Sequence, residues 1–89
     1  MPRPFRFAVV GRWTGGGARW RDFAKRAEDL GYDVLLVTDH MGPQLAPIPA
    51  LMAAADATTR LRVGSFVFAN DYRNPVMLAK EIATIDVLS

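Results

Sequence analysis

Three apolar segments with the composition of β-strands recur at nearly constant intervals along the chain. They begin at Phe5, Val34 and Leu61, so successive starts are 29 and 27 residues apart. Each segment is followed by a loop and then by a stretch of apolar residues at helical spacing. This order of strand, helix, strand, helix, strand, helix predicts an α/β protein whose parallel strands are joined by helices.

The three predicted strands differ in sequence character. Residues 5–10 are apolar apart from Arg6 and stop at Gly11, and residues 34–37 form a continuous apolar run, which predicts a strand buried on both faces. The third candidate, residues 61–68, has Gly64 in its middle. A glycine inside a strand predicts a bulge or the close approach of another group to the backbone.

The segments between and after the strands predict three helices. The first ends at Gly31, where a left-handed cap is expected. The second covers residues 50–58 after Pro49, and the third is capped by Asn74 and starts at Pro75. The apolar stripe of the first helix comprises Trp20, Phe23, Ala24, Ala27 and Leu30, and that of the third comprises Leu78, Ile82, Ile85 and Leu88.

Regular βα units of this length belong to one of two parent folds, a doubly wound sheet or a (β/α)8 barrel. At about 28 residues a unit, eight units need roughly 225 residues, which is close to the usual size of a barrel. The chain has 89 residues and three units. We therefore expect residues 1–89 to be the N-terminal part of a single (β/α)8 TIM-barrel domain, truncated after the third helix.

Composition argues against several other classes of protein. No apolar run approaches the roughly 20 residues of a membrane span, so we expect a soluble, cytoplasmic protein that does not bind membranes. With no cysteine and a single histidine, the chain offers no disulfide and no ordinary zinc site, and we expect no metal. The net charge of +2 and the arginines around Trp20 raise nucleic-acid binding as an alternative, but the helical spacing of Trp20 favours core packing.

The loops after the three strands are the expected place of function, because both parent folds bind ligands at the carboxyl ends of their strands. The first loop, residues 11–17, contains three consecutive glycines but lacks a phosphate-loop signature, which favours a flexible connection over anion binding. Asp39 ends the second strand, 24 residues after Gly15, near the place of a ribose-binding acid. A Rossmann-type module that binds NAD(P) is therefore an alternative.

His40 follows Asp39 directly and is the single histidine of the chain. Histidine is the side chain that most readily exchanges a proton near neutral pH, so His40 is the natural acid or base if this site transfers protons. The adjacent carboxylate could orient it or stabilise its charged form. A structural role is the alternative, but a place directly beyond a buried parallel strand favours function.

Three stretches of the chain form a characteristic series: FAKRAEDLGYD at 23–33, VTDH at 37–40, and TRLRVG at 59–64 leading through YRNPVMLAKE to TIDVLS at the end of the chain. In this order they resemble the luciferase-like superfamily, and more narrowly its deazaflavin-dependent oxidoreductases that use coenzyme F-420. The resemblance implies a (β/α)8 barrel with a planar cofactor in its mouth, and hydride transfer as its chemistry. It implies coenzyme F-420 as the cofactor, favoured by residues 70–75, with FMN as the alternative.

The resemblance also implies roles for individual residues. Asp39 and His40 match the family's Asp-His pair, which borders the cofactor ring and in some members makes the histidine an acid or base. Phe66 and Val67 match the position where many members have a non-proline cis peptide that supports the ring; an ordinary strand is the alternative. The implied cofactor site is thus Asp39, His40, Phe66 and Val67, with His40 as the catalytic residue. We further expect a small organic substrate and a homo-oligomer.

The chain ends at Leu88-Ser89, where the family continues with a Gly-Gly-Arg-like turn into a fourth strand. The phosphate-binding loops late in such a barrel would then be missing, and we expect weaker cofactor binding as a result. A catalytically silent fragment that self-associates through its open sheet edges is therefore a further alternative.

Overall fold

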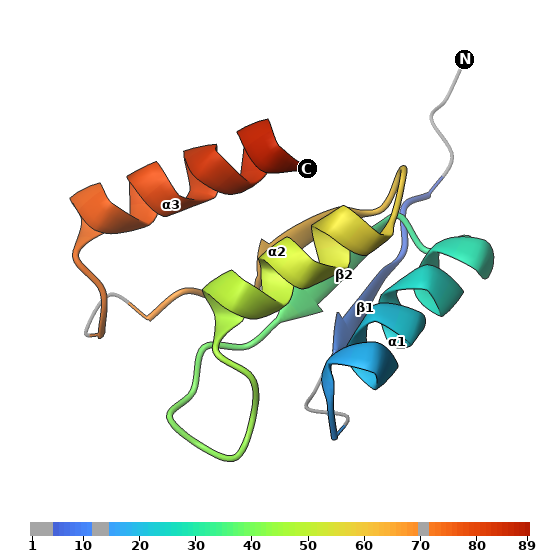
Figure 1. The fold of residues 1–89 in the computed structure, drawn as a ribbon, viewed down its shortest axis with the longest axis horizontal. Coiled ribbons are helices and arrows are strands. Elements are labelled where there is room, and N and C mark those ends of the chain that lie inside the picture. Colours follow the sequence, from blue (N-terminus) through green and yellow to red (C-terminus); the bar gives the residue numbers. More distant parts are fainter. Residues whose placement is uncertain (1–4, 12–14, 70–71) are drawn as a thin grey trace.

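The computed structural model describes residues 5–11, 15–69 and 72–89. The elements in chain order are β1 (Ala8–Gly11), α1 (Gly17–Asp29), β2 (Val34–Val37), α2 (Pro47–Ala57), β3 (Arg62–Ser65) and α3 (Pro75–Leu88). The strands form one parallel sheet in the order β1-β2-β3, with α1 and α2 packed beside each other and α3 next to α2 (Figure 1). This architecture confirms the predicted α/β fold, three successive βα units as at the start of a TIM barrel.

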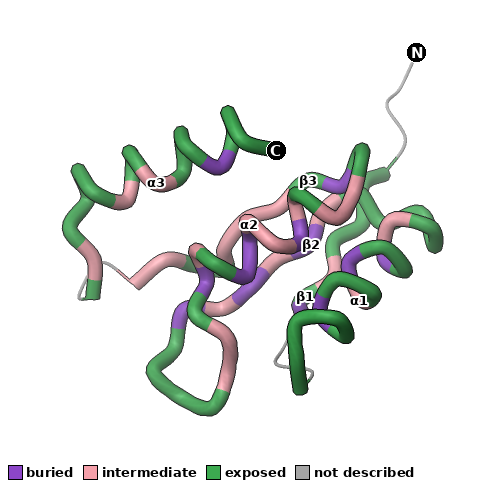
Figure 2. Tube along the Cα trace, viewed as in Figure 1, coloured by how far each residue is buried: buried purple, intermediate pink, exposed green. Residues whose placement is uncertain are grey.

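The helices cover one face of the sheet. Leu35 of β2 pairs with Val9 on one side and with Val63 on the other, and this row of side chains belongs to the core beneath the helices. Side chains alternate along a strand, so Leu36 points to the opposite face, and it is only half-buried. Figure 2 shows both buried and intermediate segments along β2. The prediction that residues 34–37 are buried on both faces is therefore wrong for the second face, because the described helices lie on one side.

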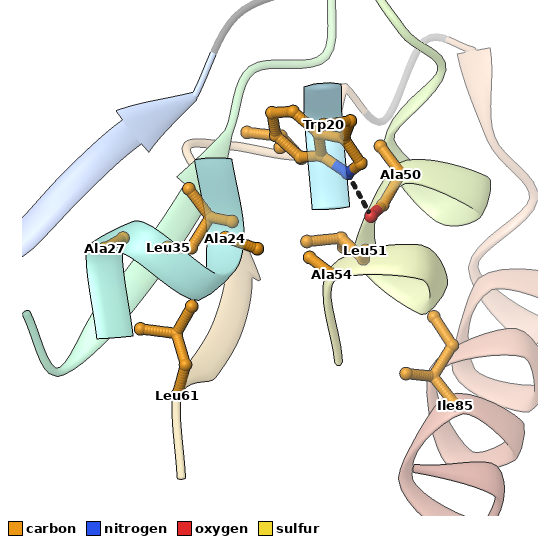
Figure 3. Close-up of a cluster of buried hydrophobic side chains, with 10 residues drawn as sticks. Trp20, Ala24, Ala27, Leu35, Ala50, Leu51, Ala54, Leu61 and Ile85 are labelled. Atoms are coloured by element: carbon orange, nitrogen blue, oxygen red, sulfur yellow. Dashed lines mark hydrogen bonds between the residues drawn. The ribbon is translucent and has the colours of Figure 1, made fainter. Parts of the chain in front are cut away.

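Trp20 lies at the centre of the core. Its side chain is 2% exposed, and its Nε1 donates a hydrogen bond to the backbone oxygen of Ala50 at 2.8 Å (Figure 3). The ring of Phe23 stacks with it at a centroid separation of 5.8 Å. Core packing of Trp20 is thus confirmed. The other buried apolar residues are Ala24, Ala27, Leu35, Val37, Ala50, Leu51, Ala54, Leu61 and Ile85.

The ends of α1 and α3 follow the capping signals in the sequence. Gly31 has a φ of +93°, and the N–H groups of Gly31 and Tyr32 donate to carbonyl oxygens of the last turn of α1. This is a Schellman motif, in which glycine carries the left-handed backbone conformation. At α3, Asn74 Oδ1 accepts a hydrogen bond from the N–H of Val76 at 2.9 Å. Both predicted helix boundaries are confirmed.

Other boundaries differ from the predictions. Helix α2 begins at Pro47, earlier than expected, because prolines are tolerated in the first turn, where N–H groups have no partner within the helix. Strand β1 begins at Ala8 and not at Phe5, because the N–H of Phe7 donates to the side chain of Asp33. Strand β3 ends at Ser65 instead of continuing to residue 68.

Strand β3 contains Gly64 without the predicted bulge. Gly64 pairs with Leu36 in a regular parallel register, and both neighbours of Gly64 are paired in the same way. A Cβ atom at Gly64 would lie 3.4 Å from Cδ2 of Leu36, within ordinary contact distance. The glycine therefore interrupts neither the ladder nor the packing.

The predicted apolar stripes are only partly buried. Leu30 at the end of the first stripe is exposed, and α3 buries Ile85 alone among its residues. The reason is that α3 contacts chiefly α2, so most of its circumference faces solvent. Within the described ranges, no helix combines the length and apolar character needed to cross a membrane.

We expect Gly11→Ala to destabilise the fold. The added carbon would lie 2.5 Å from Cη2 of Trp20, and the indole cannot move away without losing its hydrogen bond to Ala50. The expected loss in unfolding free energy is roughly 1 to 3 kcal/mol, as for other overpacked cores. Urea unfolding followed by circular dichroism measures it. Gly42→Ala is the matched control, since nothing lies within 4 Å of its added carbon; equal losses in the two variants would contradict this account of Gly11.

Candidate functional site

The connections that follow β2 and β3 meet at the carboxyl edge of the sheet. The N–H of Phe66 donates to the backbone oxygen of Val37 at 2.8 Å, which extends the pairing of the two strands one step beyond β3. Asp39 and His40 follow Val37 after one residue. The structure therefore brings the two pairs of sequence-predicted site residues to the same edge.

The peptide bond between Phe66 and Val67 is cis, as the family resemblance implied. The side chain of Phe66 is 63% exposed and that of Val67 is 68% exposed. Together they present an apolar surface directly after β3.

His40 lies in an exposed loop between β2 and α2 that is closed at its base by Gln44. The Nε2 of Gln44 donates to the backbone oxygen of Thr38 at 2.7 Å, and Oγ1 of Thr38 donates to Oε1 of Gln44 at 3.0 Å. His40 and Met41 stand between these two anchors and are exposed to solvent. The imidazole is thus accessible to a ligand, while the base of its loop is fixed.

Asp39 is 5% exposed, and both of its carboxylate oxygens are bound. Arg73 donates from Nε to Oδ2 at 2.7 Å and from Nη2 to Oδ1 at 2.9 Å. The N–H of Ala69 also donates to Oδ2, at 2.8 Å. Arg73 and Ala69 both lie in the connection between β3 and α3, so the Asp39 side chain ties that connection to the end of β2.

These contacts lower the pKa of Asp39. The hydrogen bond from Arg73 is the largest cause, and burial opposes it by raising the pKa. The N–H of Ala69 and the charges of Arg73 and His40 lower the pKa further. The pKa of Arg73 is raised in turn, chiefly by its hydrogen bond to Asp39. Asp39 is therefore an ionised anchor and not a group that exchanges protons near neutral pH.

The contacts of Asp39 argue against the Rossmann-type alternative, which requires this carboxylate to hold ribose hydroxyls. A carboxylate has about four acceptor positions, and Arg73 and Ala69 occupy three of them. The glycine-rich loop that this alternative also needs is described only in part, because residues 12–14 lie outside the described residues.

Sequence reasoning missed Arg73, Gln44 and Glu28. Arg73 follows the third strand closely, which is a weak signal, and nothing in the sequence distinguishes Gln44 or Glu28. The carboxylate of Glu28, at the end of α1, accepts hydrogen bonds from three successive backbone N–H groups, those of residues 59–61. These bonds, chiefly the one from Arg60, lower the pKa of Glu28. Glu28 acts at the opposite edge of the sheet from Asp39.

The fold and the site together define a parallel βα protein with an apolar surface and a histidine at the carboxyl edge of its sheet. Residues 5–89 match the luciferase-like monooxygenase family, and the chain belongs to that family. It is also similar to an F420-dependent glucose-6-phosphate dehydrogenase of Amycolatopsis mediterranei (strain U-32), with 34% identity over 79 residues, covering 76% of this chain. The chain spans 23% of the length of that relative.

We expect Asp39→Asn to lower the free energy of unfolding and to make that free energy depend less on pH in the acid range. A lowered pKa means that the ionised carboxylate stabilises the fold fully above the ordinary value of 3.8, and that this contribution is lost as the pH falls through the folded-state pKa. At pH 7 we expect a loss of about 2 kcal/mol. This lies below the roughly 3 to 5 kcal/mol typical of buried pairs, because Arg73 is 21% exposed and can reach water.

Urea unfolding between pH 2 and pH 7 tests this expectation. The variant should lose less stability than the wild type as the pH falls below about 4. The stability of Asp39→Asn should still fall somewhat in acid, because the pKa of Glu28 is lowered as well. Adding Glu28→Gln to this variant should remove part of the remaining pH dependence. Parallel stability curves for the wild type and Asp39→Asn would show that Asp39 is not the responsible group.

Proposed function

We propose that this chain forms part of the active site of an oxidoreductase that transfers a hydride between coenzyme F-420 and a small organic substrate. Membership of the luciferase-like family and the similarity to an F420-dependent dehydrogenase support this class of enzyme. The observation that carries the proposal is that the exposed Phe66-Val67 pair and the loop of His40 lie at the same carboxyl edge of the sheet, where Phe66 is bonded to the end of β2.

The residues at this edge fit the planar ring of such a cofactor. Cofactor sites combine apolar surface with a few placed polar groups, and Phe66 and Val67 provide apolar surface at the same sheet edge as the exposed His40. The fit does not extend to the phosphate-bearing tail, because Arg73, the one guanidinium among the described residues of these two connections, is already paired with Asp39. In a complete (β/α)8 barrel the phosphate site lies late in the sequence.

Each site residue has a distinct role in this proposal. Phe66 and Val67 would hold the ring, and a deazaflavin bound there would supply the hydride acceptor or donor. His40 gives or takes the proton that accompanies hydride transfer at the substrate. Asp39 keeps the His40 loop in place through its contacts with Arg73 and Ala69. FMN, which has a similar ring system, is the alternative cofactor.

Fluorescence titration of the purified chain with coenzyme F-420, and with FMN for comparison, tests the proposal. We expect saturable binding of coenzyme F-420 that His40→Ala weakens by about tenfold, the order of one lost contact at a binding site. Met41→Ala is the matched control, because Met41 is an exposed neighbour in the same loop. An equal loss in both variants would assign the effect to the loop and not to the imidazole.

If the chain bound neither coenzyme F-420 nor FMN, the proposal for this chain would be contradicted. The alternative of a catalytically silent chain would then predict self-association through the edges of β1 and β3. Sedimentation velocity over a range of concentrations distinguishes that outcome, since a compact monomer without affinity for either cofactor would contradict both alternatives.

A further inference from the structure

The segment from Phe66 to Ala69 is attached at both of its ends to the end of β2. At its start, the N–H of Phe66 donates to the backbone oxygen of Val37. At its end, the N–H of Ala69 donates to the Asp39 carboxylate. Phe66 and Val67 therefore lie on a short segment between two attachments. The second attachment, at Ala69, depends on the position of the Asp39 side chain.

Arg73 determines that position. Its guanidinium meets the Asp39 carboxylate with two parallel hydrogen bonds, a geometry that fixes both the separation and the relative rotation of the two groups. The guanidinium carbon also lies over the ring of Phe68, 5.5 Å from its centroid. Arg73 thus contacts both Asp39, which precedes His40, and Phe68, which follows Val67.

The surroundings of Arg73 favour this paired state. The charge of Glu81 on α3 acts with Asp39 to raise the pKa of Arg73. The residue after Arg73 is the cap of α3, Asn74, so the guanidinium is placed from a fixed helix end. Only arginine combines a permanent charge with a planar fork that reaches both oxygens of a carboxylate.

We propose that Arg73 is a positioning residue of the candidate site, which sets the His40 loop relative to the Phe66-Val67 surface by holding Asp39. The inference rests on the proposed function for its consequence in cofactor binding, but the positioning itself is a property of the fold. Arg73 does not touch the reacting atoms and acts through Asp39. A displacement of about 1 Å in a binding group can cost up to roughly 100-fold in rate.

The variants Arg73→Met, Arg73→Lys, Asp39→Asn and the double variant Arg73→Met/Asp39→Asn test this role. Arg19→Met is the matched control, because Arg19 is an exposed arginine on α1, outside the candidate site. His40 is the only histidine of the chain, so its imidazole NMR signal reports on the loop without a cofactor. Titration with coenzyme F-420 gives the second readout, and circular dichroism identifies any variant that fails to fold.

We expect one sharp imidazole signal in the wild type and in Arg19→Met, and a broadened or split signal in Arg73→Met. The dissociation constant for coenzyme F-420 should rise by about tenfold in Arg73→Met and in Asp39→Asn, and by no more than that in the double variant, because coupled residues are not additive. Arg73→Lys should restore part of both readouts. If Arg73→Met does not fold, Arg73→Lys alone should show the intermediate signal.

An unchanged imidazole signal in a folded Arg73→Met or Arg73→Lys variant would overturn the proposal. The proposal would also be overturned if the two substitutions acted independently, so that the rise in the dissociation constant of the double variant equalled the product of the two single rises. If the wild type does not bind coenzyme F-420, the proposed function fails, whereas the imidazole signal still decides whether Arg73 positions the His40 loop.

Discussion

The hydrogen bond from the Trp20 indole to the backbone oxygen of Ala50 is the interaction on which the packing of this chain depends. It joins α1 to the first turns of α2 inside the core, where both partners are shielded from water. The same ring lies against Gly11 at the end of β1, so one side chain fixes two helices against the sheet. Alanines at the contact between α1 and α2 let the helices approach closely. Because α2 follows the His40 loop, its position also sets that loop.

Two carboxylates hold the short strand β3 at its two ends. Glu28 binds the backbone N–H groups of the chain that enters the strand, and Asp39 binds the N–H of Ala69 in the chain that leaves it. Both acids come from the preceding part of the chain. The pKa of Glu28 is lowered chiefly by the N–H of Arg60, and the pKa of Asp39 is lowered chiefly by its hydrogen bond from Arg73 and further by the N–H of Ala69. The third strand, with four residues, is therefore held by charge-assisted bonds as well as by its ladder to β2.

Features that depend on nearby residues could be predicted from the sequence, and features that depend on the path of the chain could not. The caps at Gly31 and Asn74 and the strand over residues 34–37 result from local backbone preferences, so short patterns were sufficient. The pairing of Asp39 with Arg73 joins residues 34 positions apart across two loops, and no local pattern encodes that distance. One-sided burial of β2 likewise depends on where the helices lie. The cis peptide at Phe66 was predicted through family resemblance alone.

Thr38 and Gln44 close the base of the His40 loop with two hydrogen bonds. Because the Gln44 side chain bonds to the side chain and the backbone oxygen of Thr38, the segment after β2 is joined to the segment before α2 independently of residues 41–43. Residues 41–43 can therefore differ in length or composition while the framework on either side stays as it is. The tip of this loop is therefore a place where the sequence can change without rebuilding the sheet that carries it.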